Sequence, residues 1–226
     1  MTTTMALPVE QHNVEIQRNR EAWSRKPALR EVYYGFYRLI ASRIDPKRPG
    51  LVVELGSGMG RIKEIIPTCV TTDLFPNPWL DRQENAYRLS FADDSVSHLI
   101  LFDVWHHLRY PGTALREFRR VLVPGGCFRV VLPDAELVMK RYFEAPNALV
   151  AWRGHGGTAM EAVNSCFRQR YEHQFLYDWP TLEQMLRRAG FDEVVRVAFG
   201  RTRRPELALD DPKYEWESLY VEAIKP

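Results

Sequence analysis

The sequence is poor in cysteine and in long apolar runs, and each shortage argues against a class of protein. Its three cysteines, Cys69, Cys127 and Cys166, are odd in number and far apart, which favours reduced thiols over a disulfide framework or a zinc site. Residues 1–20 lack the continuous apolar core of a signal peptide, and no later apolar run is long enough to span a bilayer. We therefore expect a cytoplasmic protein without a membrane partner.

The chain also lacks a strong excess of charge. It carries 31 Lys and Arg residues against 29 Asp and Glu residues, a formal net charge of +2. Basic residues cluster only at Arg201, Arg203 and Arg204, which gives no strong positive surface of the kind that binds nucleic acid. We expect no nucleic-acid partner and interpret the small cluster as a solvated loop, with binding of a phosphate or carboxylate as the alternative.

What the sequence contains is the composition of one globular domain. With 226 residues, of which 45% are hydrophobic, it is long enough to bury one sizeable core. Apolar runs that predict strands alternate with stretches of helical spacing, and this alternation is typical of a parallel sheet. Strands are predicted at residues 51–55, 69–73, 97–103, 127–132, 191–199 and 217–224, and helices at 61–66, 112–122 and 181–189.

Residues 1–50 are predicted to form a helical segment that covers the functional site of a main domain over residues 51–226. Residues 10–23 are polar with sparse apolar positions and predict a loose leader. A helix with an aromatic face follows, because apolar residues recur at helical spacing between Leu29 and Ile40. Such a stripe is more often core than a surface that stacks on a ligand, and both interpretations stay open. Its aromatic members are Tyr33, Tyr34, Phe36 and Tyr37.

Residues 133–180 break the alternation and predict a cap inserted after the fifth strand. This stretch is rich in aromatic residues, contains His155 and His173, and includes the flexible run at 154–157. Asp134 is predicted either to bind hydroxyl groups of a ligand or to cap the helix that follows it. Thr181 is predicted as the N-cap of the next helix.

A glycine-rich loop directly follows the first predicted strand. Gly56, Gly58 and Gly60 leave backbone amides open to a ligand, and the helix that begins after them favours an anionic group. Asp73, at the end of the next strand, is placed to accept two hydrogen bonds from a ribose diol. The third glycine comes one residue too early for the dinucleotide fingerprint. A glycine loop also occurs as a mere tight connection, but with Asp73 it favours a nucleoside ligand other than a dinucleotide.

Five motifs in order resemble those of class I S-adenosylmethionine-dependent methyltransferases, in the type 11 branch that includes the ubiquinone-type enzymes. The resemblance covers residues 51–132. It implies a Rossmann-like α/β fold with a seven-stranded sheet, parallel except for the last strand, and helices on both faces. It also implies S-adenosylmethionine as the cofactor. The motifs are Glu54-Leu55-Gly56-Ser57-Gly58-Met59-Gly60, Asp73, Ser90-Phe91-Ala92-Asp93-Asp94-Ser95, Asp103-Val104-Trp105-His106-His107-Leu108 and Arg120-Val121-Leu122-Val123-Pro124-Gly125-Gly126.

The same resemblance implies roles for individual residues. Glu54 and the loop backbone would hold the amino-acid end of the cofactor, Asp73 the ribose, and Phe75 one face of the adenine. Asn85 stands where these enzymes usually have an acid that contacts the adenine amino group, and its amide oxygen can accept the same hydrogen bond. The implied cofactor-binding set is Glu54, Gly56, Ser57, Gly58, Gly60, Asp73, Leu74, Phe75, Asn85, Ala86, Asp103 and Val104.

Methyl transfer from a sulfonium is a direct displacement, so the protein has mainly to align the acceptor with the methyl group and exclude water. A hydroxyl acceptor profits from a histidine near the working pH, and we predict His106 and His173 as catalytic residues, with a packing role as the alternative for each. Together with Asp103 and Asp134 these histidines could ligate a metal, but no local run has ligand spacing, so no metal is predicted.

The last part of the chain resembles small methyltransferases predicted among polysaccharide-biosynthesis enzymes. This similarity implies a saccharide acceptor. We therefore expect O-methylation of a saccharide or another small hydroxylated metabolite. The alternatives are N- or C-methylation of a quinone-like or secondary-metabolite ring, and a cofactor-binding module without activity. The segments that carry the similarity are residues 171–178, 186–191, 205–207 and 218–223.

Overall fold

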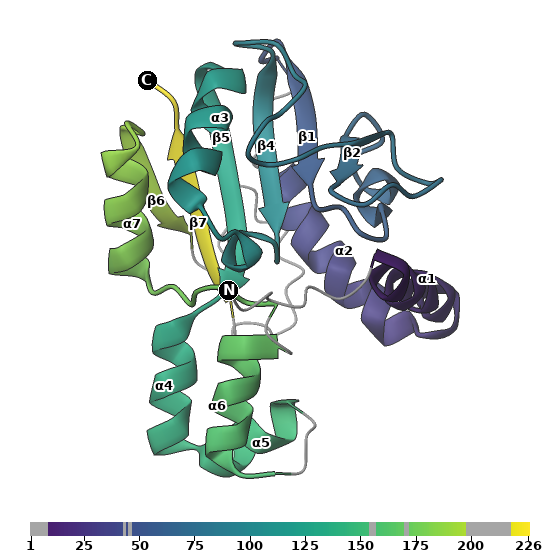
Figure 1. Ribbon diagram of the computed structural model, residues 1–226, viewed down its shortest axis with the longest axis vertical. Helices are drawn as coiled ribbons and strands as arrows, with labels where there is room; N and C mark the ends of the chain where they lie inside the picture. Colours follow the sequence, from purple (N-terminus) through teal and green to yellow (C-terminus); the bar gives the residue numbers. More distant parts are fainter. Residues whose placement is uncertain (1–8, 43, 45–46, 154–156, 170–171, 198–217) are drawn as a thin grey trace, which may run out of the picture.

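A single seven-stranded sheet forms the centre of the protein (Figure 1). The computed structural model describes residues 9–42, 44, 47–153, 157–169, 172–197 and 218–226. The strand order is β3-β2-β1-β4-β5-β7-β6. The strands are β1 (Leu51–Leu55), β2 (Val70–Asp73), β3 (Arg82–Gln83), β4 (Val96–Phe102), β5 (Leu122–Pro133), β6 (Glu193–Val197) and β7 (Ser218–Ile224).

The direction of the strands confirms the predicted topology. Strands β3, β2, β1, β4 and β5 pair in parallel, whereas β7 runs antiparallel to both β5 and β6. The chain moves outward from β1 to β2 and β3 and then returns to place β4 on the other side of β1. In open α/β sheets, ligands bind at the carboxyl ends of the strands where the order reverses in this way. The topology therefore places the expected site beyond β1 and β4.

Helices cover both faces of the sheet, as predicted. The side chains of β4 alternate between the faces, because Leu99 and Leu101 pack with α3 and α7 while Ile100 packs with α2. Figure 1 shows α3 in front of the sheet and α2 behind it. The helices are α1 (Val9–Arg25), α2 (Pro27–Ala41), α3 (Pro111–Val121), α4 (Ala135–Glu144), α5 (Pro146–Arg153), α6 (Ala159–Arg168) and α7 (Trp179–Arg188), with short 3-10 turns η1 (Arg61–Glu64) and η2 (Trp105–His107).

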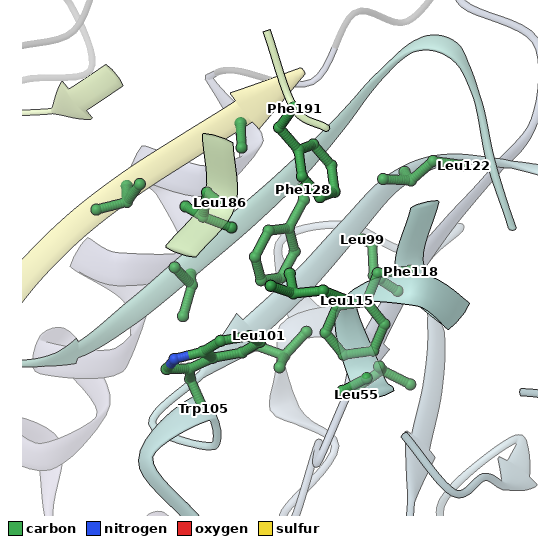
Figure 2. Close-up of a cluster of buried hydrophobic side chains, with 14 of the residues drawn as sticks. Leu55, Leu99, Leu101, Trp105, Leu115, Phe118, Leu122, Phe128, Leu186 and Phe191 are labelled. Atoms are coloured by element: carbon green, nitrogen blue, oxygen red, sulfur yellow. The ribbon is translucent and has the colours of Figure 1, made fainter. Parts of the chain in front are cut away.

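The larger core lies between the sheet and the helices α3 and α7. Figure 2 shows Trp105, Phe118 and Phe128 gathered at its centre, with Phe191 beside them. The ring centroids of Phe118 and Phe128 are 5.3 Å apart, and Trp105 lies 5.7 Å from Phe128. All three side chains are fully buried. The indole of Trp105 thereby anchors η2, the turn that carries the two adjacent histidines.

The prediction of a loose leader over residues 10–23 is wrong, because this stretch forms most of α1. Its few apolar residues do not repeat strongly enough to indicate a helix, but tertiary contacts hold it. Trp23 is buried against α2, with its ring 5.5 Å from Tyr33 and 5.6 Å from Tyr34 in edge-to-face contacts. Burial of one aromatic ring thus holds a helix that the local pattern does not predict.

The predicted N-cap of α7 is also corrected. The cap is Asp178, whose carboxylate accepts a hydrogen bond from the Thr181 backbone at 3.0 Å, so Thr181 lies inside the first turn. Asp134 caps α4 in the same way, accepting from Glu136 N at 2.9 Å, and its other oxygen pairs with Arg196 at 2.8 Å. Of the two roles predicted for Asp134, the structure shows the capping hydrogen bond.

The helices α4, α5 and α6 follow β5 and stand apart from the sheet as a small bundle (Figure 1). They pack on one another through a separate apolar cluster that includes Val138, Leu149 and Val163. Several earlier predictions lie outside the described residues, namely those on His155, Tyr171, Arg201, Arg203, Arg204 and residues 205–207. Within the described part of the chain, no helix has both the length and the apolar character needed to cross a membrane.

Candidate functional site

A cavity of about 510 Å³ lies at the carboxyl ends of β1, β2 and β4, where the topology places a ligand. The glycine loop after β1 lines it. Another part of its wall comes from Ile16 and Asn19 of α1 and from Tyr33 and Tyr37 of α2. The two N-terminal helices thus complete a site whose other parts belong to the sheet.

The glycine loop has a conformation that explains its composition. Gly56, Gly58 and Gly60 have φ angles of +71°, +47° and +64°, in the left-handed region that favours glycine. A Cβ atom on Gly56 would lie 2.3 Å from a methyl group of Val104, so the loop also packs too closely for a side chain there. Ser57 fixes the loop to β2, since its amide donates to the Thr72 carbonyl at 2.7 Å. The loop is therefore held rigidly against the cavity.

Glu54, a buried acid near the end of β1, lines the cavity. Burial raises the pKa of Glu54 to about 8, and the nearby charge of Asp73 acts in the same direction, while a hydrogen bond with Ser57 opposes it. A cationic group of a ligand beside this carboxyl would favour its ionised form. Glu54 is therefore a candidate for contact with a positively charged group of a ligand.

Asp73 lies at the end of β2 and faces the same cavity. One of its carboxylate oxygens accepts from the Gly58 amide at 3.0 Å and the other from the Phe75 amide at 3.2 Å. Each oxygen retains a second lone pair, so the carboxylate can still accept from a diol. Phe75 lines the cavity as well. The acid and the ring therefore lie side by side, as a nucleoside site requires.

The structure brings most of the predicted cofactor residues to the cavity, but not all. Asn85 has its side-chain oxygen bound to the Tyr87 amide at 2.9 Å in a local turn. The neighbouring acid Glu84 is buried, and its carboxylate accepts from the amide and the hydroxyl of Ser90. Sequence reasoning overlooked this acid. Among the described residues, the predicted members that line the cavity are Glu54, Gly56, Ser57, Gly58, Asp73, Phe75, Asp103 and Val104, and those that do not are Gly60, Leu74, Asn85 and Ala86.

The predicted catalytic histidines His106 and His173 lie side by side, with ring centroids 4.2 Å apart. Both are buried, and neither lines the cavity. His107 lines it instead, 4.4 Å from the ring of His106 and 4.8 Å from that of His173. The chemical role of each histidine stays a prediction. The prediction named His106 and not His107, and the signal that could have indicated His107 is that the two histidines are adjacent in the sequence.

The remaining polar groups of the cavity come from two segments that are close only in space. Arg109 follows η2, whereas Glu172 and Gln174 precede α7. The backbone amide of Gln174 donates to the carbonyl of His106 at 2.9 Å, which ties the two segments together. Sequence reasoning missed these three residues, because nothing in the local pattern indicates which polar residues the fold brings to the cavity.

Comparison with known proteins agrees with this geometry. The family described as a methyltransferase domain matches residues 29–197. A Thermotoga maritima structure described as an S-adenosylmethionine-dependent methyltransferase and possible histamine N-methyltransferase is similar, with 16% identity, a TM-score of 0.64, and coverage of 95% of this chain and 98% of that one.

Two further solved structures share the fold. One is a complex between the Haloferax volcanii Trm112 methyltransferase activator and a methyltransferase (17% identity, TM-score 0.59, 93% of this chain and 97% of that chain). The other is Haemonchus contortus phosphoethanolamine N-methyltransferase 2 bound to S-adenosylmethionine (12% identity, TM-score 0.53, 85% of this chain and 53% of that chain). No curated protein matches the sequence. The family match spans most of the chain, and the protein therefore belongs to the methyltransferase-domain family as a class I S-adenosylmethionine-dependent methyltransferase.

Proposed function

We propose that this methyltransferase transfers the methyl group of S-adenosylmethionine to a hydroxyl oxygen of a small acceptor, with saccharides as the first class to test. The observation that carries the proposal is the polar end of the cavity, where His107, Arg109, Glu172 and Gln174 offer donors and acceptors of hydrogen bonds. A polyol presents the same mixture of groups. The cavity volume of about 510 Å³ lies in the range of small-molecule sites.

The donor end of the cavity fits S-adenosylmethionine. In our proposal the ammonium group lies beside Glu54, the ribose hydroxyls donate to Asp73, and the adenine stacks on Phe75. Each of these residues lines the cavity, and the glycine loop supplies backbone between them. The acceptor would then enter from the side of Asp103 and His107, which are close along the chain and follow β4.

In this reaction the protein itself forms no covalent bond with the acceptor or the cofactor. The acceptor oxygen forms a bond with the methyl carbon as the bond from that carbon to sulfur breaks, and the hydroxyl proton is lost. That His106 and His173 assist the loss of the proton stays our prediction. His107 is the histidine in contact with the cavity, and it lies beside both of them.

We also propose that residues 1–50 serve as a cover over the bound cofactor, because Ile16, Asn19, Tyr33 and Tyr37 line the same cavity as the glycine loop. The cap predicted at residues 133–180 would then contribute through its last part, which holds Glu172 and Gln174. Methylation of a nitrogen or carbon on a ring is the second candidate. The aromatic wall of Tyr33, Tyr37 and Phe102 favours it.

The decisive experiment is an acceptor screen with S-adenosylmethionine labelled in the methyl group. Sugars, nucleotide-sugars, phenols, amines and quinones are offered separately, and the methylated atom is identified by mass spectrometry and NMR. We expect methyl ethers of a hydroxylated acceptor. Products methylated only on nitrogen or carbon, or cofactor binding without any transfer in the whole screen, would contradict the proposal.

A matched pair of variants controls the donor end. Asp73→Ala is expected to weaken S-adenosylmethionine binding by about 1.5–3 kcal/mol, the scale of hydrogen bonds to a charged group. Asp93→Ala removes an exposed acid that does not line the cavity and whose carboxylate lies 2.7 Å from the Arg120 guanidinium. This variant should leave the affinity for S-adenosylmethionine unchanged. Calorimetry measures both. Equal affinities of the two variants would remove Asp73 from the ribose site.

A further inference from the structure

Three imidazoles meet beside the cavity in an arrangement that the methyl-transfer site alone does not require. His106 and His107 come from η2, and His173 comes from the segment before α7. One ring nitrogen of each lies within 4.8 Å of the corresponding nitrogens of the other two. No other set of three such side chains with this proximity occurs among the described residues.

Each ring of this cluster faces a group that can fix its orientation. The Nδ1 atom of His173 lies 2.6 Å from the carbonyl oxygen of Cys166, and a carbonyl can only accept, so Nδ1 carries the proton and the lone pair of the neutral ring is on Nε2. His107 interacts in the same manner with the backbone of Glu172. The Nε2 atom of His106 lies 3.6 Å from a carboxylate oxygen of Asp103.

Such second contacts are the usual surroundings of metal-binding histidines. A ligating histidine almost always donates its other ring N–H to a backbone carbonyl or a carboxylate, which fixes the tautomer and orients the lone pair toward the ion. Here two rings have carbonyl partners and the third has a carboxylate neighbour.

We propose that His106, His107 and His173 bind one divalent transition-metal ion, with Zn²⁺ as the first candidate. Three imidazole nitrogens suit zinc and its first-row neighbours, whereas magnesium and calcium prefer oxygen ligands. Zinc bonds of about 2.0–2.1 Å in a tetrahedron separate the nitrogens by about 3.4 Å. The ligand atoms, now at most 4.8 Å apart, would therefore have to approach by no more than about 1.5 Å.

The consequence for catalysis rests on the proposed function. Three protein ligands leave a fourth position open, and His107 is the ligand that lines the cavity, so an acceptor oxygen can reach that position. A hydroxyl bound to the ion loses its proton to water more readily. The alkoxide then forms the bond to the methyl carbon, and the electron pair of the broken bond stays on sulfur.

Metal binding is tested without any acceptor, so that its outcome is independent of the acceptor screen. Untagged, chelator-treated protein is titrated with Co²⁺ and followed by visible absorption, and with Zn²⁺ by calorimetry. We expect one ion per chain, a tetrahedral Co²⁺ spectrum, and a loss of affinity of a hundredfold or more in His107→Ala and in His173→Ala. The His98→Gln variant removes a histidine of β4 whose Nδ1 atom lies 3.1 Å from the Ser97 hydroxyl and which is not part of the cluster, and it should bind the ion like the wild type.

Absence of stoichiometric binding, or binding that survives in both cluster variants, overturns the proposal. Because His173 is buried, the His173→Ala substitution can alter the thermal midpoint of the protein. In that case the test uses the His107→Gln variant instead, since the side chain of His107 lines the cavity. If an acceptor is known, its methylation by the chelator-treated enzyme should fall at least tenfold and return with Zn²⁺. Full activity of metal-free protein would overturn the catalytic role and leave the O-methylation proposal intact.

Discussion

Glu54 is the residue whose protonation state we expect to depend on ligand binding. Its carboxyl is mostly protonated at neutral pH in the free protein, because burial raises its pKa to about 8. The cofactor brings an ammonium and a sulfonium group, and both favour the ionised carboxylate. We therefore predict that S-adenosylmethionine binding at pH 7 releases close to one proton from Glu54.

Calorimetry in buffers of different ionisation enthalpy measures this proton directly. The Glu54→Gln variant, which keeps the size of the side chain but cannot ionise, should bind the cofactor more weakly and release no proton. Asp93→Ala again serves as the exposed control, with release like the wild type. Proton release that persists in Glu54→Gln would place the titrating group elsewhere.

At the same scale, the predicted site residues that line the cavity are those whose position follows from a local pattern. Gly56, Gly58 and Asp73 stand at fixed positions around strand ends, and the fold brings them to one cavity. The prediction for Asn85 differs from the structure, because its side-chain oxygen accepts a hydrogen bond from the Tyr87 amide within a local turn. This bond depends on backbone geometry that the sequence pattern does not indicate. His107 gained a role only once η2 showed which of two adjacent histidines faces the cavity.

Among the elements, α1 is the one whose contacts decide the shape of the cofactor site. Trp23 fixes it to α2, and the guanidinium of Arg61 lies 5.4 Å from the centre of the indole. Arg20 donates to the Met59 carbonyl in the glycine loop and lies 4.7 Å from the ring centre of Trp79. The helix thus contacts both the second helix and the glycine loop, to which we assign cofactor binding in our proposal.

We predict that Trp23→Ala releases α1 from the protein without unfolding the sheet. Removal of a buried tryptophan costs about 3–5 kcal/mol, more than the few polar contacts of the helix offset. Hydrogen exchange should show faster exchange confined to α1 and its contacts, and S-adenosylmethionine should bind more weakly, since Ile16 and Asn19 leave the wall. Val14→Ala, at an exposed position of the same helix, is the control. Normal protection of α1 in Trp23→Ala would contradict this role of the indole.

For the whole molecule, the sequence predicted the sheet better than its surroundings. The order and direction of the strands follow from βα units and short connections, which leave a distinct pattern along the chain. The helix α1 and the histidine cluster depend instead on contacts between distant segments. Trp23 meets Tyr34 across a helix break, and His173 meets His106 only after the bundle α4–α6 has intervened. No periodicity encodes such contacts.

Two groups of the cavity, the buried Glu54 and the half-buried His107, give the whole molecule an unusual dependence of stability on pH. The pKa of Glu54 rises from 4.5 to about 8 on folding, so the native state binds more protons than the unfolded state between these values and stability falls as pH rises. The pKa of His107 falls from 6.5 to about 3, so the unfolded state binds more protons in that window and stability rises with pH.

The two effects oppose each other where their windows overlap, from pH 4.5 to 6.5. Above pH 6.5 Glu54 is the one of these two groups that still titrates, and we predict that the cofactor-free and metal-free protein loses up to about 2 kcal/mol of unfolding free energy between pH 6.5 and 8. Urea denaturation at a series of pH values measures this loss. Glu54→Gln should abolish the decline, whereas His107→Gln should extend it downward to pH 4.5, because nothing then opposes Glu54. Saturating S-adenosylmethionine should also abolish it, since the bound cation keeps the carboxylate ionised. A decline that Glu54→Gln leaves unchanged would assign it to other groups.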